Sequence, residues 1–448
     1  MRRRHSLLAA AAAPALLLMG ACSADDAPAP DAVPVTAGTS DEGTPTAAEE
    51  RQSRQPRLVA TYDGGVVVLD ALTLEVLADV ELEGFNRLAG AGDGRHVLVS
   101  HTATDPGWHV LDAGAWTEGH GDHDHYYVGE PHLTGVVIPA EEPAHVVPHH
   151  GLTTLFDDGT GAVTVIDPAA LAVHVDADHE EPEHADDDHA KGQEDDHDAG
   201  PAALVVARGT SQAPHHGVAV TLADGSMVAT LGTEDARPGI RVLDPAGTEV
   251  ARNEDCPGVH GEGVAAGETV LLGCENGVLL VRDGVITKLT SPTPFGRIGN
   301  IYVGEDHAVA AGDFKPDPDQ GLTLTQVALI DTQAATLRVV DVPGGAGFTW
   351  RGVGRGSDGE IVILGTDGAL HVLDPATGTP TATWPVIGPW TAPEEWQTAH
   401  PALVVLEGTA YVTDPATSSV HAVDVLTGEV WATATLPEAT NELVGLTG

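Results

Sequence analysis

The sequence is poor in basic residues, aromatic residues and cysteine. Its 448 residues include 20 Lys and Arg against 67 Asp and Glu, which gives a formal net charge of −47. Such a surface repels nucleic acid and anionic lipid, so neither is expected as a partner, and it attracts cations and basic protein faces. Strong acidity also aids solubility, and for most of the surface this simpler explanation stays open.

Long apolar runs are scarce as well, and the exception lies at the N-terminus. Three arginines at 2–4 precede an apolar stretch at 7–18, which ends in Met-Gly-Ala-Cys. This order predicts a lipoprotein signal peptide over residues 1–22, with Cys22 as the lipid-attachment site. A transmembrane anchor is the alternative, but the run is shorter than the roughly 20 residues that a bilayer span needs. We therefore expect an extracytoplasmic protein, lipid-anchored to the outer face of the cell membrane, and a twin-arginine export route stays open.

Residues 23–56 lack the side chains from which a core is built. They are rich in Ala, Pro, Asp, Thr and Glu and contain almost no aromatic or branched apolar residues. Such a segment cannot bury enough surface to fold, so we predict a disordered tether. The folded domain is then expected to occupy residues 57–448.

The sequence contains only three cysteines, and lipidation of Cys22 would leave Cys256 and Cys274. In an exported protein, a pair this close in sequence predicts a disulfide. A pair of thiolates that binds a soft metal is the alternative. We therefore expect a disulfide between Cys256 and Cys274.

A repeated unit organises residues 57–448. It consists of short strands with alternating apolar residues, an Asp-Gly or Glu-Gly turn, a strand that ends in Leu-Asp or Ile-Asp, and a turn similar to Pro-Ala-Thr-Gly. Eight such units begin near Arg57, Arg87, His149, His215, His260, Arg297, Arg351 and His400. They predict an all-β fold, a single β-propeller of eight four-stranded blades, whose C-terminal strand closes the ring. Seven blades, or a pair of β-sandwiches, are the alternatives.

Several of the 23 histidines share one place in the repeat. His150, His216, His260 and His400 are each expected just before the innermost strand of a blade, at the rim of the central channel. Four imidazoles at one level supply the ligand type and number of a tetrahedral zinc site. Glu262 is expected as a fifth ligand or as an acceptor for an imidazole N–H. Copper, nickel and cobalt also bind imidazole, so the identity of the metal stays open.

Two further segments are rich in histidine. A loop in the second blade carries His120, His123 and His125 among acidic residues. This spacing lets imidazoles close on a cation from one mobile segment, and a solvated polar loop is the alternative. Residues 174–198 are predicted to be a disordered insertion that either concentrates zinc or serves as a solvated spacer.

The motifs of the chain resemble those of the AztD-type zinc metallochaperones, which accompany ABC-type zinc importers. The resemblance covers about residues 57–448 and rests on segments such as HGDHDHYY, HVVPHHG, APHHGVAV, CPGVHGE and LVVLEGTAYVTDPAT. It implies a β-propeller that binds Zn(II) and passes it directly to the importer's solute-binding protein. It further implies an exchange loop at His120, His123 and His125 and channel ligands at His149, His215, His216, His260 and His400.

Two other functions are compatible with a propeller. A metal-dependent hydrolase or lactonase needs zinc with an open water position, whereas four histidines would close the shell, and no Gly-x-Ser-x-Gly motif is present. A metal-independent interaction scaffold would leave the histidines without a role. We therefore favour a zinc carrier that is not an enzyme.

Overall fold

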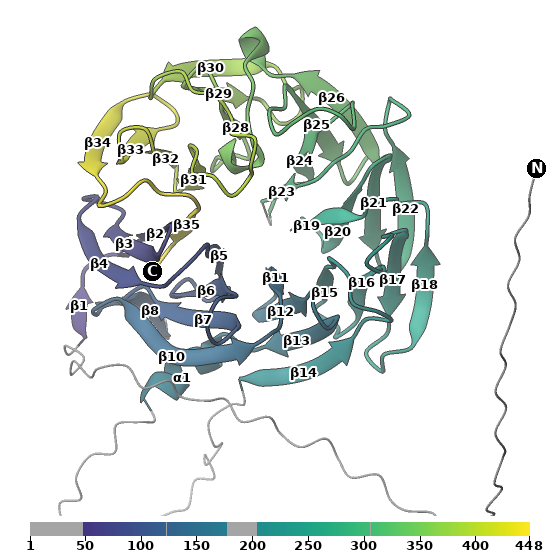
Figure 1. Ribbon diagram of the computed structural model, residues 1–448, viewed down its shortest axis with the longest axis horizontal. Helices are drawn as coiled ribbons and strands as arrows, with labels where there is room; N and C mark the ends of the chain where they lie inside the picture. Colours follow the sequence, from purple (N-terminus) through teal and green to yellow (C-terminus); the bar gives the residue numbers. More distant parts are fainter. Residues whose placement is uncertain (1–47, 122, 177–203, 305) are drawn as a thin grey trace, which may run out of the picture. The chain divides into compact units, whose positions relative to one another are not determined.

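The strands of this computed structural model form eight four-stranded antiparallel sheets and one three-stranded sheet in the residues that it describes. These are residues 48–121, 123–176, 204–304 and 306–448, and all of them lie in the second of two compact units, Val35–Gly448. Figure 1 shows the four-stranded sheets following one another around a common axis. This is the eight-bladed propeller that the repeat predicts.

Each blade has four strands, which follow one another from the axis outwards. Blade 1 consists of β35 (Leu443–Leu446), β2 (Arg57–Tyr62), β3 (Gly65–Asp70) and β4 (Val76–Glu81). Blade 2 consists of β5 (Arg87–Gly90), β6 (His96–His101), β7 (Gly107–Asp112) and β10 (His132–Pro139). Blade 3 consists of β11 (Pro143–His149), β12 (Leu152–Asp157), β13 (Ala162–Ile166) and β14 (Val205–Thr210). Blade 4 consists of β15 (Ala219–Thr221), β16 (Met227–Leu231), β17 (Gly239–Leu243) and β18 (Glu249–Asn253).

The other four blades repeat this order. Blade 5 consists of β19 (His260–Ala265), β20 (Thr269–Cys274), β21 (Gly277–Arg282) and β22 (Val285–Thr290). Blade 6 consists of β23 (Ile301–Tyr302), β24 (Val309–Phe314), β25 (Gln326–Asp331) and β26 (Thr336–Asp341). Blade 7 consists of β27 (Val353–Arg355), β28 (Ile361–Leu364), β29 (Ala369–Leu373) and β30 (Pro380–Pro385), preceded by two 3-10 turns, η1 (Pro343–Gly345) and η2 (Trp350–Gly352). Blade 8 consists of β31 (Leu403–Leu406), β32 (Thr409–Asp414), β33 (Ser419–Asp424) and β34 (Val430–Thr435).

The C-terminal strand closes the ring. β35 pairs antiparallel with β2, with Leu446 opposite Arg57 and Leu443 opposite Ala60. The last strand of the chain thus becomes the innermost strand of blade 1, as the ELVGLTG segment predicts. Closure gives β2 its inner partner and joins the two ends of the chain in one blade, so that the short inner edge of each sheet faces the axis of the ring.

The core lies between neighbouring blades. The two central strands of a blade are buried on both faces, as in β3, where Val66, Val67 and Val68 are all fully buried. The outermost strands alternate between exposed and half-buried side chains, as in β34. One interblade cluster joins Trp108 of blade 2 to Leu155 of blade 3. Burial of these apolar faces, at about 25 cal/mol per Å², is what holds the blades together.

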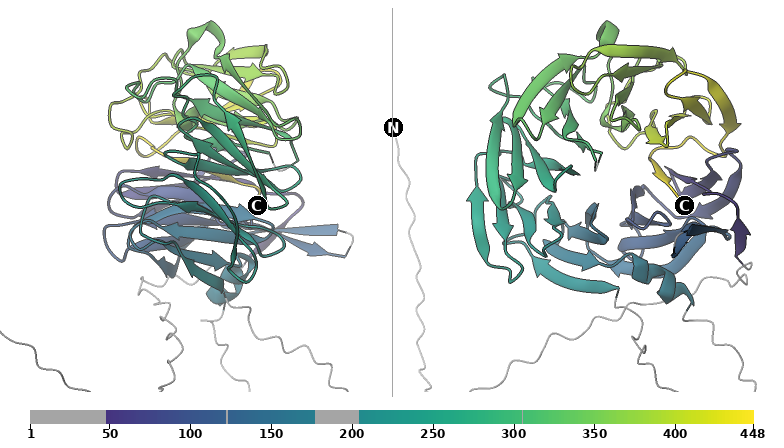
Figure 2. Two further views of the ribbon diagram at one scale, coloured as in Figure 1. Left: turned by 90° about the vertical axis from the view of Figure 1, so that its right-hand side faces the viewer. Right: turned by 180° about the vertical axis from the view of Figure 1, so that it is seen from behind.

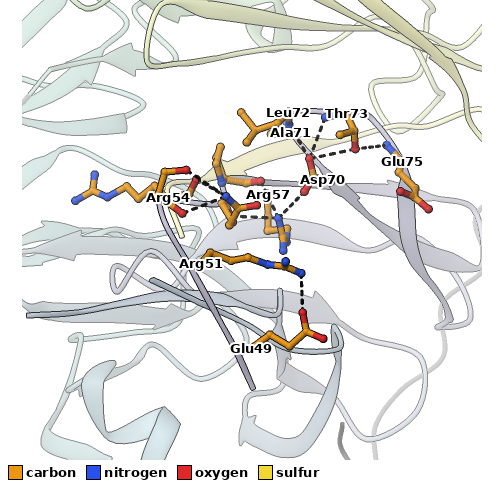
Figure 3. Close-up of polar contacts among 12 residues, drawn as sticks. Glu49, Arg51, Arg54, Arg57, Asp70, Ala71, Leu72, Thr73 and Glu75 are labelled. Atoms are coloured by element: carbon orange, nitrogen blue, oxygen red, sulfur yellow. Dashed lines mark hydrogen bonds and ion pairs between the residues drawn. The ribbon is translucent and has the colours of Figure 1, made fainter. Parts of the chain in front are cut away.

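A recurring aspartate shapes the turn between the third and fourth strands. In blade 1, Asp70 Oδ1 accepts the backbone N–H of Thr73 at 2.9 Å, while Oδ2 pairs with the buried Arg57 at 3.0 Å (Figure 3). The Asp374 and Asp424 carboxylates accept turn N–H groups in the same way. The Leu-Asp strand endings seen in the sequence are therefore turn-forming residues rather than ligands.

Three insertions depart from the repeat. Between β7 and β10, β8 (Ala115–His120) and β9 (His123–Val128) form a hairpin, which projects from the ring in Figure 2. The short strand β1 (Glu49–Arg51) pairs antiparallel with β9. Helix α1 (Ala169–Asp176) follows β13. These elements correct three expectations: the histidine loop is a β-hairpin, part of the tether is a strand, and residues 174–176 of the predicted disordered insertion are the end of a helix.

The remaining segment predictions fall on residues outside those described. These are the signal peptide over 1–22 with Cys22, the tether up to residue 47, and the insertion from residue 177 onward. In the described part of the chain, no helix is long and apolar enough to cross a membrane. Cys256 and Cys274 form a disulfide that joins the segment before β19 to the end of β20.

Blade 3 begins earlier than the sequence suggests. The repeat placed its start near His149, but the innermost strand β11 begins at Pro143 and ends at His149. His150 and Gly151 instead form the tight turn to β12, with φ of 49° and 74°. The pattern was misleading because β11 contains two prolines and lacks regular apolar alternation.

The antiparallel order of the strands gives the ring two distinct ends. Links between blades, and links between second and third strands, lie at one end, which we call the crossover end. Links between first and second strands, and between third and fourth strands, lie at the other. The β8–β9 hairpin joins the third and fourth strands of blade 2, so we call this the hairpin end.

Candidate metal centre

Three histidines from neighbouring blades meet at the crossover end. His145 belongs to β11, His216 precedes β15, and His260 opens β19. One ring nitrogen from each lies within 4.8 Å of the others. Their ring centroids are 5.0 Å (145 to 216), 5.1 Å (145 to 260) and 4.9 Å (216 to 260) apart. We call this group the triad.

Two of these imidazoles are oriented by oxygen atoms that can only accept. His216 Nδ1 lies 2.5 Å from a carboxylate oxygen of Asp158, and His260 Nδ1 lies 2.5 Å from the Gly299 carbonyl oxygen. Each Nδ1 must therefore carry the proton and donate it. The Nε2 atoms are left with free lone pairs, which is the tautomer in which histidine binds a metal through Nε2.

Glycine allows the backbone approach on which this contact depends. Gly261 has a φ of 58°, and a Cβ there would lie 2.5 Å from the Gly299 carbonyl oxygen. The β-bulge between His260 and Glu262 is centred on this residue. The CPGVHGE motif thus contributes both a candidate ligand and the close packing that orients it.

The third imidazole is held by a buried carboxylate. His145 Nδ1 lies 3.1 Å from Glu262 Oε1, and the two side chains are only 14% and 16% exposed. Glu262 therefore lies behind His145, in the position of an acceptor for its N–H. All three members of the triad share one arrangement, with Nδ1 bound to an oxygen atom.

The Nε2 atoms of His216 and His260 lie 2.9 Å apart. With both Nδ1 atoms protonated, two lone pairs face each other at this distance, which is unfavourable unless a proton or a metal ion lies between them. Around tetrahedral zinc, with Zn–N near 2.1 Å, ligand nitrogens are about 3.4 Å apart. The spacings within the triad, from 2.9 Å up to at most 4.8 Å, bracket this value. The triad therefore fits a metal that prefers imidazole nitrogen.

The protonation of the triad is divided between its members. Burial disfavours the charged form of His145, but the Glu262 carboxylate outweighs it, so the pKa of His145 is raised. Burial acts in the opposite sense on Glu262, and the charge of His145 lowers the pKa of that carboxyl. Burial, together with the charges of His145 and His216, holds the pKa of His260 well below its ordinary value. His260 therefore loses its charge at a lower pH than an ordinary histidine, whereas His145 keeps its proton to a higher pH, so that a metal competes with this proton.

The other histidines implied as channel ligands lie elsewhere. His149 Nε2 lies 2.9 Å from Glu268 Oε1 at the hairpin end. His215 is buried with both ring nitrogens bonded, to the Ala213 carbonyl and to the Thr230 hydroxyl, each at 2.9 Å. Within the described residues, only His216 and His260 of the implied set join the triad.

His400 lies in a separate cluster. The residue is 2% exposed, and its ring stacks on Trp390 and contacts the guanidinium of Arg351. Burial and the charge of Arg351 lower the pKa of His400 to about 4. The structure therefore surrounds it with a cation and an indole ring.

Two residues of the site, His145 and Asp158, were not predicted from the sequence. His145 is the first residue of the HVVPHHG motif, and it was overlooked because the start of blade 3 was placed after it. Asp158 lies in the turn after β12, where an acidic residue resembles any other turn residue. A correct start for blade 3 was the signal that could have identified His145; Asp158 has no such signal in a single sequence.

A second histidine group lies on the β8–β9 hairpin. His120, His123 and His125 each offer a nitrogen within 4.8 Å of the others. His123 Nε2 and His125 Nε2 are 3.1 Å apart. This group is more exposed than the triad and lies at the opposite end of the ring.

Comparison with known proteins supports the resemblance seen in the motifs. No protein-family model matches the chain. The zinc chaperone AztD of Citrobacter koseri is 24% identical over 391 residues, which cover 85% of this chain and 83% of that protein. A crystal structure of Citrobacter koseri AztD superposes with a TM-score of 0.70 at 22% identity, over 88% of this chain and 98% of that one. The structure of apo AztD from the same organism gives 0.69 at 21% identity, with the same coverage.

These likenesses confirm the resemblance to AztD and the propeller fold. The relative's name is that of a chaperone and carries no enzymatic activity.

Proposed function

We propose that this AztD-like chain is a zinc chaperone that binds Zn(II) at the triad and passes it directly to the solute-binding protein of an ABC-type zinc importer. The observation that carries the proposal is the convergence of His145, His216 and His260, each with its Nδ1 bonded to an oxygen atom. Such preorganisation lowers the entropic cost of binding. The triad is therefore suited to hold zinc tightly.

Three protein ligands suit transfer as well as binding. Zinc takes four ligands in most protein sites, so the triad leaves one position open. A ligand from an acceptor protein can enter there before the histidines release the metal. Zinc would then move through a shared intermediate without becoming a free ion. The hairpin group at His120, His123 and His125 is proposed as a separate exchange site, at which zinc is captured before it is held at the triad.

The charge and the N-terminus of the chain suit this role outside the cytoplasm. A formal net charge of −47 raises the local concentration of cations around the ring. We propose that Cys22 is lipidated, so that the propeller is anchored to the outer face of the cell membrane. There the chain would meet an importer's solute-binding protein by diffusion in two dimensions.

A rate measurement tests direct transfer. The zinc-loaded chain is mixed either with an excess of a metal-free zinc solute-binding protein or with a chelator of similar affinity, and metal loss is followed by stopped flow. We expect the rate to rise with the concentration of the acceptor protein and to exceed the rate with the chelator. Equal rates, independent of the acceptor, would mean that zinc simply dissociates and would refute direct transfer.

The same preparation tests the enzymatic alternative. Zinc with three histidines and an open position is also a geometry in which a bound water can become a nucleophile. We expect no zinc-dependent turnover of ester or lactone substrates by the loaded chain. Turnover that disappears in His260→Ala would contradict the chaperone proposal.

A further inference from the structure

The hairpin histidines share one face of a small β-sheet. In the β8–β9 pairing, His120 lies opposite His123, and Glu118 lies opposite His125. Because side chains alternate along a strand, these four residues and Tyr127 point to the same side. The group is therefore presented on a defined surface rather than on an unstructured loop.

The N-terminal strand contributes a carboxylate to this face. β1 pairs with β9 so that Glu50 lies opposite Tyr127, two residues from His125. Glu50 Oε1 lies 2.6 Å from His125 Nδ1. A carboxylate accepts, so His125 donates from Nδ1 and keeps the lone pair on Nε2. That Nε2 lies 3.1 Å from His123 Nε2.

The arrangement repeats the one found in the triad. There Asp158 holds His216 by Nδ1, and the Nε2 atom faces a second imidazole. On the hairpin, Glu50 holds His125 in the same way. The two sites thus share one design, but the carboxylate of the hairpin site belongs to a segment that lies outside the propeller repeat.

The contact between Glu50 and His125 contributes little to the stability of the fold. The side chains of Glu50 and His125 are 58% and 32% exposed. An exposed ion pair of this kind contributes about 0–1 kcal/mol to stability. The pairing of three residues in β1 adds only a short edge strand. Stability alone therefore does not account for a carboxylate placed behind a candidate metal ligand.

We propose that β1 is a docking strand that completes the hairpin metal site, with Glu50 as the positioning residue for His125. Zinc on the hairpin and docking of the N-terminal segment then favour each other by the same factor, as binding linkage requires. The inference rests on the proposed function only in taking the hairpin histidines as a zinc site. It adds that zinc on the hairpin fixes the segment N-terminal to the propeller.

The test isolates the hairpin site in the full chain. His145→Ala, His216→Ala and His260→Ala together remove the triad, and zinc affinity is measured by competition with a chromophoric chelator. In this background we expect Glu50→Gln to raise the Kd about 10- to 100-fold, the usual cost of losing a carboxylate behind a zinc-bound histidine. An unchanged Kd would overturn the inference.

A matched control lies next to the substituted residue. Glu49→Gln changes the same side chain one position earlier in β1, where Glu49 pairs with Arg51 at 2.9 Å and points to the other face. We expect its Kd to stay within about twofold of the parent, since no ligand is touched. An effect equal to that of Glu50→Gln would show that bulk charge, not positioning, is responsible.

Trypsin reports on docking independently of affinity. Arg51 lies in β1 and Arg54 follows it, so docking should shield the chain from cleavage at these residues. We expect zinc to slow their cleavage in the parent and not in Glu50→Gln, as followed by mass spectrometry. Cleavage unaffected by zinc in the parent would refute the coupling.

The outcomes separate this inference from the proposed function. If the chain without its triad binds no zinc while the unmodified chain still transfers zinc, the hairpin inference fails and the chaperone proposal stands. If the hairpin binds zinc but the unmodified chain fails the transfer test, the hairpin inference stands and the chaperone proposal fails.

Discussion

The two histidines of β11 give opposite predictions for zinc binding. His145 faces His216 and His260 at the crossover end, whereas His149 is paired with Glu268 at the hairpin end. His145→Ala should therefore weaken zinc binding at the triad, and His149→Ala should not. The comparison is direct because the two residues lie on the same strand.

The magnitude follows from what each substitution removes. Loss of a group behind a zinc ligand costs about 10- to 100-fold in affinity, and loss of the ligand itself should exceed this range. For His145→Ala we therefore expect a Kd increase of more than about 100-fold, or roughly 2.7 kcal/mol. For His149→Ala we expect a change within about threefold, since the triad keeps all its imidazoles.

His145→Ala also leaves the mostly buried Glu262 carboxylate without its ion-pair partner. Breaking a fully buried pair costs about 3–5 kcal/mol, and this pair, 14% and 16% exposed, should cost less. His145→Gln is the second variant, because its amide can still donate to Glu262 but offers no imidazole nitrogen. Urea unfolding of each variant separates a loss of fold from a loss of ligand.

The assay is a competitive zinc titration of the unmodified chain and the three variants at pH 7.5. The variants His145→Ala and His145→Gln should both lose tight binding, and the latter should unfold near the urea midpoint of the unmodified chain. Tight binding retained by both, together with its loss in His149→Ala, would refute the assignment of the triad. The ligand set implied by the sequence would then be preferred.

Three further predictions concern the surroundings of the triad. The pKa of His145 is raised by its ion pair with Glu262, so protons compete with zinc for this imidazole. When zinc affinity is measured at decreasing pH from 8 to 5, it should begin to fall before the pH reaches 6.5, the ordinary histidine value. Asp158→Asn, which weakens the hold on an imidazole Nδ1, should raise the zinc Kd about 10- to 100-fold in the competitive titration while leaving the urea midpoint nearly unchanged. Replacing Cys256 and Cys274 by serine opens a loop of 18 residues and should lower the free energy of unfolding by about 3 kcal/mol in urea titrations, with zinc affinity retained if the folded state is preserved.

The fold could be predicted because its signal is repeated. Alternating strands, Leu-Asp endings and Gly-containing turns recur along the chain, so an error in one unit is outweighed by the others. The error in blade 3 shows the limit of this signal. With Pro143 and Pro148 in β11, the alternation is lost. His149 and His150 were therefore expected at the start of the innermost strand, whereas His149 ends this strand and His150 follows it.

The site could be predicted only in part because ligand geometry depends on side-chain direction. His215 and His216 are adjacent in the sequence, just before the first strand of blade 4. His215 points into the core against Phe156, whereas His216 points to the triad. Which one turns inward is decided by tertiary contacts, in this case the Thr230 hydroxyl that binds His215. For the same reason no local pattern could show that Arg351 contacts His400.

The presence of strand β1 could not be predicted from the sequence for a different reason. The composition of residues 23–56 is that of an unfolded chain, and in isolation such a segment has no core to join. β1 is ordered by pairing with the edge of β9, a surface that exists only once the hairpin has formed. A strand whose only pairing partner is another element cannot be recognised from its own sequence.

The shared design of the two histidine groups, together with their different burial, assigns them different roles. In both groups, an oxygen atom accepts a hydrogen bond from an imidazole Nδ1, and the Nε2 atoms of two histidines lie 2.9 Å (triad) or 3.1 Å (hairpin) apart. In the triad, His145 and Glu262 are mostly buried and His260 is half-buried, so electrostatic interactions are stronger and the ligands are already ordered. The hairpin group is more exposed, and its carboxylate, Glu50, comes from the short edge strand β1. The physical expectation is a tight holding site at the crossover end and a weaker, faster site at the hairpin end, so that capture and retention of zinc are separated along the axis of the ring.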